Sequence, residues 1–336
     1  MKNTLVLLLC AVLLPIVAQA DLFAPGNVIF ADPNYNAGAE NGQVVELKIN
    51  GDSAEIVNVV RWNLDNATRR RPLGIDVDPN GTVWVGLTAA FGDTQEFPEG
   101  IAEILRIDPD GTQTFVTADI IKGTYLAALG PNEVYISSNA ADASTPFRYV
   151  IENGEITDRA EFQKSGDGEA LRLPDGRLLQ GDSGAPGIHI FDDAGGPPIG
   201  MFYNGDKTVR SLTYNDQIGS VIASLHDQVT LQRISLDGEL EEEHNAGDDG
   251  FGNLWGIAQV PGSTNIIMGS HNIDENRNRF ALYNALDLAA GPRIITIDSG
   301  FVENDLPADY TFRSLFNMAV IPGGEIPSGL DIWELF

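Results

Sequence analysis

Apolar residues in this chain occur in short runs that come in pairs, with turn-forming residues between the two runs of a pair. The clearest pair spans residues 73–86, where Leu-Gly-Ile-Asp-Val and Thr-Val-Trp-Val flank the turn Asp-Pro-Asn-Gly. Proline fixes φ, and glycine accepts the left-handed conformation that closes a hairpin. Pairs of the same kind span residues 125–138, 169–181, 209–225 and 254–270. The pattern predicts a β-hairpin at each of these places.

A second hairpin is predicted after most of these pairs. Its strands are residues 104–107 with 112–116, 147–151 with 155–159, and 229–235 with 239–243. Helical periodicity is nearly absent, so we expect an all-β protein. Four antiparallel strands per unit form the blade of a β-propeller.

The spacing of the repeats predicts the number of blades. The ends of the second strands fall at equivalent positions that are 43 to 55 residues apart: Pro33 (or Asp32), Thr88, Asn139, Asp182, His226 and His271. This spacing fits a blade of roughly 40–50 residues, so six blades are expected. The chain begins with a second strand, 27–31, and ends with a spare first strand, 316–321. Their pairing would close one shared blade, whereas an open solenoid would not explain two matching leftover strands.

The first 20 residues have the features of a secretory signal. Lys2 supplies a positive start, an apolar run covers residues 5–17, and Ala18-Gln19-Ala20 matches the small-x-small cleavage pattern. The run is too short for a good membrane span, and no later segment is long and apolar enough for one. We therefore expect a secreted or periplasmic protein with residues 1–20 as signal peptide and 21–336 as one propeller domain. Cys10 leaves with the signal, so the mature chain has no thiol.

The net charge of the chain limits the classes of ligand that it can bind. The sequence holds 48 acidic and 20 basic residues, for a formal net charge of −28. Such a chain repels phosphate backbones, so nucleic acid is a poor partner, and cations or neutral ligands are accepted more easily. A negative charge also keeps a protein soluble, and this alternative explains the composition without any ligand. We expect a monomer that binds a small molecule or a protein.

Two sets of residues are candidates for a site on the face of the ring around the channel. The first set lies at second-strand ends, where Asp182, His226 and His271 could hold a transition metal such as zinc. His226 could instead act as a general base. Asn139 occupies the equivalent position and could bind a ligand. Strand ends are also polar simply because turns are polar.

The second set lies where first strands begin. The residues at these starts are Leu73, Thr124, Gly168, Arg210, Trp255 and Phe316. Asp167 and Glu169 flank Gly168 and could bind a cation or orient a polar substrate, with Glu169 as a catalytic carboxylate. Arg210, Trp255 and Arg313 are further ligand-binding candidates. Surface ion pairs and a Trp packed between blades would explain the same residues.

Residues 74–85, with weaker echoes at 169–179 and 255–267, resemble the gluconolactonase-like (senescence-marker-protein) propellers and the related NHL-repeat proteins. The resemblance implies a six-bladed propeller. It also implies one divalent cation, such as Ca, Zn or Mg, held by Glu, Asn and Asp at first-strand starts. None of the six residues at those starts is a good ligand here. Asp167 and Glu169 are one residue out of register, and adjacent strand residues point to opposite faces.

Two functions follow from these observations. The first is an exported, non-catalytic propeller that binds a small molecule or a protein in or over the channel. The alternative is a metal-dependent lactonase or esterase in which a cation polarises the carbonyl and Glu169 or His226 activates water. Because the first-strand starts lack the Glu, Asn and Asp ligands that the resemblance implies, the non-catalytic binding protein is favoured.

Overall fold

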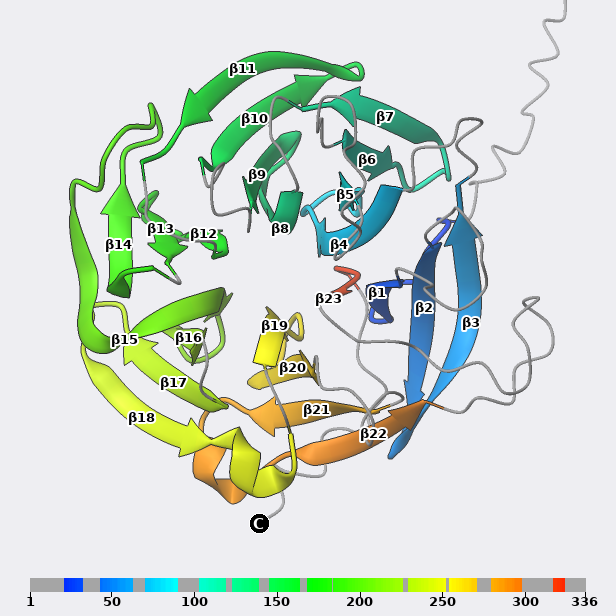
Figure 1. Cartoon of the computed structure of the whole chain (residues 1–336). Helices are drawn as coiled ribbons and strands as arrows, with labels where there is room; N and C mark the ends of the chain where they lie inside the picture. The colour runs from blue at the N-terminus through cyan, green and yellow to red at the C-terminus, as the bar shows by residue number, and fades with distance from the viewer. Residues whose placement is uncertain are drawn as a thin grey trace, which may run out of the picture.

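Antiparallel strands make up nearly all the regular structure of the chain. The computed structural model describes residues 21–32, 43–62, 70–89, 103–118, 123–138, 145–163, 168–182, 184–225, 229–251, 254–270, 279–297 and 317–323. The strands form four sheets that stand around a central axis, with β4, β8, β12, β19 and β23 near the centre (Figure 1).

Two of the sheets are four-stranded meanders that run in chain order from the centre to the rim. The first contains β4 (Arg70–Val77), β5 (Val83–Ala89), β6 (Glu103–Ile107) and β7 (Gln113–Thr117). The second contains β8 (Gly123–Gly130), β9 (Glu133–Ser138), β10 (Phe147–Glu152) and β11 (Glu155–Glu161). The turns are those that the sequence predicts, such as Asp78-Pro-Asn-Gly81 between β4 and β5.

The third sheet has seven strands. They are β12 (Ala170–Arg172), β13 (Leu178–Gly181), β14 (Pro186–Phe191), β15 (Gly200–Asn215), β16 (Ser220–Leu225), β17 (Thr230–Ser235) and β18 (Leu240–Asn245). β15 is 16 residues long. Its first part pairs with β14 and its second part pairs with β16, so this one strand belongs to two meanders.

The fourth sheet joins the two ends of the chain. Its order is β19-β20-β21-β22-β3-β2-β1-β23, with β19 (Leu254–Gln259), β20 (Asn265–Ser270), β21 (Arg279–Asn284), β22 (Arg293–Ile297), β3 (Ser53–Arg61), β2 (Gln43–Asn50), β1 (Val28–Asp32) and β23 (Met318–Val320). β22 and β3 are parallel and share two residue pairs. β1 pairs with β23 antiparallel, with Val28 opposite Val320. Two short 3₁₀ helices complete the described structure, η1 (Ala246–Asp249) and η2 (Leu288–Ala290).

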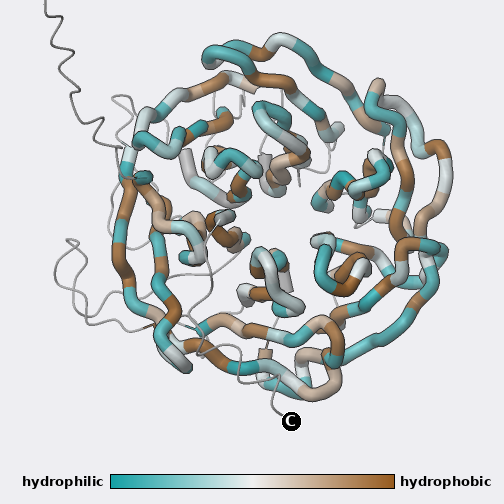
Figure 2. The backbone as a smooth tube through the Cα atoms, turned by 180° about the vertical axis from the view of Figure 1, so that it is seen from behind, coloured by the Kyte–Doolittle hydropathy of each residue, from teal (hydrophilic) through white to brown (hydrophobic). Residues whose placement is uncertain are grey.

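The core lies between neighbouring meanders. Among the described residues, six hydrophobic clusters follow one another around the ring. Alternate residues of one strand enter different clusters: Val28 and Phe30 of β1 enter one, and Ile29 and Ala31 enter the next. Because side chains alternate between the two faces of a strand, a strand that is buried on both faces is apolar throughout. The apolar runs are visible along the strands near the centre (Figure 2).

The structure confirms the prediction of an all-β chain built from successive hairpins. The hairpin predicted at 147–151 and 155–159, for example, is β10 and β11. Residues 1–20 lie outside the described residues, so the signal peptide stays a prediction. In the part of the chain that is described, no helix is long and apolar enough to cross a membrane.

Candidate functional site

The innermost strands carry a pairing irregularity at the positions that the repeat predicts to be equivalent. The pairing of β4, β8, β15 and β19 with the next strand shifts register at Leu73, at Thr124, at Arg210 and within 255–256. An unpaired residue in a strand bends it and re-aims the neighbouring side chains. The four strand starts therefore share a local geometry as well as a place in the sequence repeat.

Gly168 occupies the corresponding place before β12, and the surrounding backbone leaves no room for a side chain there. A Cβ at Gly168 would lie 2.4 Å from the carbonyl oxygen of Gly181. The Ser137 Oγ donates a hydrogen bond of 2.9 Å to the Gly168 carbonyl oxygen. No metal-ligating side chain fits at this position of the ring.

Glu169 is buried and links neighbouring innermost strands. The residue is 8% exposed. Its Oε2 accepts hydrogen bonds from the Ser211 Oγ and from the Leu212 backbone N–H. The Ser211 Oγ in turn accepts a bond of 3.3 Å from the Ile257 N–H. Because the inner edge of each sheet presents unpaired backbone groups, these side chains satisfy donors that lack a strand partner.

Asp76 on β4 likewise links two other innermost strands, β4 and β8, by accepting a backbone hydrogen bond. Its Oδ2 accepts a hydrogen bond of 2.8 Å from the Ala128 N–H on β8, and its Oδ1 accepts one from the Val77 N–H. The sequence analysis did not single out Asp76. The signal available was a carboxylate in the middle of an otherwise apolar run, Gly74-Ile-Asp-Val77.

Burial shifts the titration of both carboxyl groups. It raises the pKa of Glu169 to about 8; the hydrogen bond from Ser211 opposes this rise and the negative charge of Asp76 adds to it. Burial also raises the pKa of Asp76 to about 6, against the backbone hydrogen bonds from Ala128 and Val77. Desolvation penalises the charged form of an acid. Glu169 is therefore mainly protonated at neutral pH.

Among the described residues, the starts of the first strands offer little to a divalent cation. Gly168 has no side chain, the Glu169 carboxyl group is bound by Ser211 and Leu212, and Arg210, 5% exposed, is itself positively charged. Across the described ranges, no three His, Cys, Asp or Glu side chains are grouped to hold a metal ion. Divalent metals in oxygen sites need several ionised or carbonyl ligands.

Asp182, at the end of β13, lines a pocket between the second and third sheets. The pocket has a volume of about 490 Å³. Its walls come from the ends of β11 and β13, from β14, and from the segments before β10 and β15: Thr145, Glu161, Phe162, Gln163, Asp182, Ala185, His189, Phe191 and Pro198. Asp182 is 3% exposed, and its Oδ1 accepts a hydrogen bond of 2.7 Å from the Gly184 N–H.

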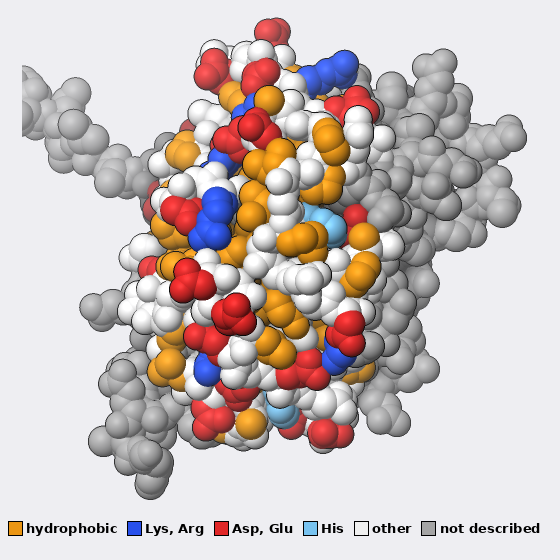
Figure 3. Space-filling model, turned by 90° about the vertical axis from the view of Figure 1, so that its left-hand side faces the viewer, with side chains coloured by type: hydrophobic (Ala, Val, Ile, Leu, Met, Phe, Trp, Pro, Cys, Tyr) orange, Lys and Arg blue, Asp and Glu red, His pale blue; other side chains and the backbone are white. Residues whose placement is uncertain are grey.

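Aromatic rings form part of the pocket wall. Phe162 and Phe191 pack edge to face, with ring centroids 5.7 Å apart and an interplanar angle of 88°. The His189 ring lies 6.5 Å from the Phe191 ring, and the buried His189 Nε2 has no hydrogen-bond partner among the described residues. On the side of the molecule that carries β14 and β15, hydrophobic side chains are exposed between acidic ones (Figure 3).

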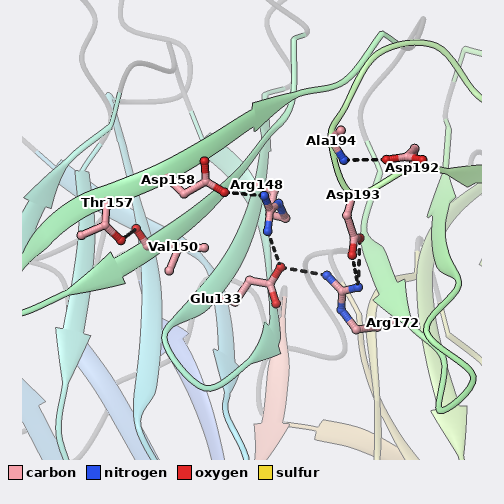
Figure 4. Close-up of polar contacts among 9 residues, drawn as sticks. All are labelled: Glu133, Arg148, Val150, Thr157, Asp158, Arg172, Asp192, Asp193 and Ala194. Atoms are coloured by element: carbon pink, nitrogen blue, oxygen red, sulfur yellow. Dashed lines mark hydrogen bonds and ion pairs between the residues drawn. The ribbon is translucent and has the colours of Figure 1, made fainter.

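An ion-pair network joins the same two sheets. Glu133 accepts hydrogen bonds from Arg148 at 2.9 Å and from Arg172 at 2.8 Å. Arg148 also binds Asp158, and Arg172 also binds Asp193 (Figure 4). Three carboxylates therefore surround two guanidinium groups, which leaves the network with a negative charge.

Comparison with known proteins identifies the fold but not a family. No family model matches the sequence, and no curated protein matches it. Among solved structures, a chain of the nidogen/laminin complex has a TM-score of 0.61 at 12% identity, over 88% of this chain and 98% of that one. A Bacteroides caccae protein of unknown function has a TM-score of 0.57 at 11% identity, over 89% and 100%. The periplasmic gluconolactonase PpgL of Pseudomonas aeruginosa has a TM-score of 0.55 at 13% identity, over 80% and 81%.

The fold is that of a β-propeller. The predicted resemblance to gluconolactonase-like and NHL-type propellers is thus confirmed at the level of the fold. One of these neighbours is named as a gluconolactonase and another comes from a complex between proteins. Because one fold supports both, the function of this propeller has to be argued from its own residues.

Several predicted site residues lie outside the part of the propeller that the structure describes. They are Asn139, Asp167, His226, His271 and Arg313. The backbone of Trp255 lies in β19, and its side chain is not described. The predicted metal site of Asp182, His226 and His271 therefore stays a prediction. Of the candidates that are described, Glu169 and Arg210 lie together where β12 and β15 meet, and Asp182 lines the pocket.

Sequence reasoning missed Ser211 and His189 as well as Asp76. Ser211 follows Arg210 in the strand pattern and had no distinguishing neighbour. His189 lies inside β14 and pairs with Gln180 on β13 and Met201 on β15. Its place in a pocket depends on how the second and third sheets lie beside each other, which the local pattern does not contain.

Proposed function

We propose that this propeller is an exported, non-catalytic binding protein whose ligand, a small molecule or part of a protein, sits on the face of the ring that carries Asp182. The observation that carries the proposal is the pocket of about 490 Å³ between β11 and β14. Its volume falls in the range of roughly 300–1,000 Å³ that is usual for ligand sites, and it combines apolar walls with a few polar groups. Glu169, the predicted catalytic carboxylate, is committed instead to hydrogen bonds between strands.

The proposed architecture has six blades, one of which is shared by the two ends of the chain. The strand order supports this count. The seven-stranded sheet divides within β15, and the eight-stranded sheet divides where β22 and β3 share only two residue pairs. Division at these places leaves six meanders, in agreement with the six hydrophobic clusters of the described residues. The pairing of β1 with β23 supports closure of the ring.

Export is proposed from the sequence of residues 1–20. N-terminal sequencing of the protein from an expressing bacterial culture tests it. Secreted or periplasmic protein that begins at Asp21 is expected, whereas an intact Met1 on protein inside the cell would contradict export.

A ligand screen tests the binding function. The thermal unfolding of the mature protein is measured against neutral, anionic and cationic small molecules and against short peptides, for wild type and for Asp182→Asn. A ligand that stabilises wild type should stabilise the variant less, because binding to the folded state raises its stability. Stabilisation that is equal in both proteins would place the ligand elsewhere and contradict the proposed site.

Lactone hydrolysis is the second candidate function, and the titration of Glu169 favours it. A carboxyl group with a pKa of about 8 holds a proton at neutral pH that it could donate to a leaving oxygen. A pH-stat assay with aldonolactones compares wild type with Glu169→Gln. Turnover by wild type that falls by about a hundredfold or more in the variant would favour the enzyme over the binding protein, since general acid–base groups contribute on that order.

A further inference from the structure

We propose that the pocket between β11 and β14 binds an organic cation, namely a primary ammonium or guanidinium group carried on a short apolar chain. This inference rests on the proposed binding function and assigns the chemical class of its ligand. None of the described lining residues belongs to an innermost strand, although Asp182 lies next to the position of Gly168.

The charges around the pocket favour a positive ligand. Glu161 and Asp182 line it, and no Lys or Arg is among its described lining residues. The arginines of the ion-pair network that joins the same two sheets, Arg148 and Arg172, are already bound by carboxylates (Figure 4). The chain as a whole carries a net charge of −28. A cleft lined by negative charges in such a chain concentrates cations and repels anions.

The hydrogen-bonding groups favour a ligand that donates. The carboxylates of Glu161 and Asp182 only accept when they are ionised. The buried His189 Nε2, which has no hydrogen-bond partner among the described residues, is a further polar group at the pocket. An ammonium offers three N–H donors and a guanidinium offers five, so either group can serve two carboxylates at once.

The apolar walls favour a ligand with a carbon chain. Phe162, Phe191, Ala185 and Pro198 line the pocket beside the acidic groups. Burial of methylene groups against such a surface contributes about 0.8 kcal/mol for each CH₂. A bare metal ion would leave this surface unused, and no three acidic or imidazole side chains of the described chain are grouped to bind one.

Calorimetric titration of the mature protein tests the proposal with four probes. Agmatine and cadaverine carry the expected cations on apolar chains, pentanediol is the neutral analogue, and glutarate is the anionic one. Both cations should bind. The diol and the dianion should show no binding at the same concentrations.

Three variants test the assigned residues. Asp182→Asn should weaken agmatine binding by about tenfold or more, because a buried charge-assisted hydrogen bond contributes roughly 1.5–3 kcal/mol. Glu161→Gln, at an exposed position, should weaken it by about two- to fivefold. Glu239→Gln removes the same charge from the exposed turn before β18 and should leave the affinity unchanged.

The outcomes separate the ligand class from the binding function. Asp182-dependent binding of the diol or of glutarate, without preference for the amines, would overturn the cation proposal and leave a binding protein. If no probe and no ligand of the screen binds, both proposals fall. Should Asp182→Asn unfold, Glu161→Gln decides, since an unchanged affinity in that variant contradicts the site.

The cation could be a free amine or a basic side chain of a partner protein. Blocked tripeptides with a central Arg or Lys are titrated beside agmatine and cadaverine to distinguish these sources. Tighter binding of the peptides would support a protein partner, and tighter binding of the free amines would support a small molecule. Either result supports the pocket chemistry, and binding of neither kind contradicts it.

Discussion

Two carboxyl groups near the centre of the ring, the buried one of Glu169 and the part-buried one of Asp76, occupy places where backbone N–H groups lack a strand partner. Each accepts a hydrogen bond from the innermost strand of the next unit, at Ala128 and at Leu212. An unsatisfied buried donor costs about 1–3 kcal/mol, so these bonds have a structural purpose that does not require a substrate. Their raised pKa values follow from the same burial.

Stability at alkaline pH should improve when Glu169 is replaced by Gln. The folded-state pKa of Glu169 is about 8, against an ordinary value of 4.5. Its contribution to stability is therefore fully present below pH 4.5 and is lost as the pH rises through 8. Urea unfolding should show a free energy that falls from pH 5 to 8.5 in wild type and falls less in Glu169→Gln, by on the order of 4 kcal/mol. Parallel curves for the two proteins would mean that Glu169 does not titrate in this range.

Replacement of Gly168 by Ala should destabilise the ring. The added Cβ would lie 2.4 Å from the Gly181 carbonyl oxygen, so backbone must move. Overpacking of this kind costs about 1–3 kcal/mol. Gly200→Ala is the matched control, because its Cβ would meet only the Ile190 Cδ1 at 3.9 Å. Equal urea midpoints for the two variants would contradict the close approach at Gly168.

At the scale of the element, β15 is the strand that the sequence pattern did not reveal in full. Asn204-Gly205 is a strong turn signal. The structure instead carries the strand through these residues, from pairing with β14 to pairing with β16. A local signal is overridden here because the two ends of the strand complete two different meanders.

The predictable part of the fold is the part that depends on local pattern. The Asp-Pro-Asn-Gly turn and the alternation of Val83, Trp84 and Val85 between two clusters are enough to predict the hairpin of β4 and β5. Asp182 could be predicted because it ends such a strand. The pocket around it could not, because Phe162, directly after β11, and His189 on β14 line it together only once the two sheets are in place.

The ion-pair network should stabilise the contact between the second and third sheets. Glu133→Gln removes the shared partner of Arg148 and Arg172, whose side chains are 13% and 21% exposed. We expect a loss of about 1–2 kcal/mol in unfolding free energy, larger than for an exposed pair. Asp193→Asn, at a side chain that is 51% exposed, should cost about 0.5 kcal/mol or less. A reversed order of the two losses would contradict the central position of Glu133.

At the scale of the whole molecule, the short strand β23 should contribute strongly to stability if its pairing with β1 closes the ring. Ala319 is 2% exposed and enters a cluster with Ile29 and Val44. A carboxylate there would be buried without a partner. Ala319→Glu should therefore cost about 3 kcal/mol or more in thermal and urea unfolding. Val57→Glu, at an exposed position of β3, is the control, and a similar small cost for both would mean that β23 is dispensable.

Hydrogen exchange of the mature protein with and without saturating agmatine tests most directly whether this propeller binds its ligand and where the ligand binds. We expect slower exchange at the ends of β11 and β13 and along β14, with no change at the innermost strands β4, β12 and β19. Protection confined to those innermost strands, or no protection anywhere, would contradict it.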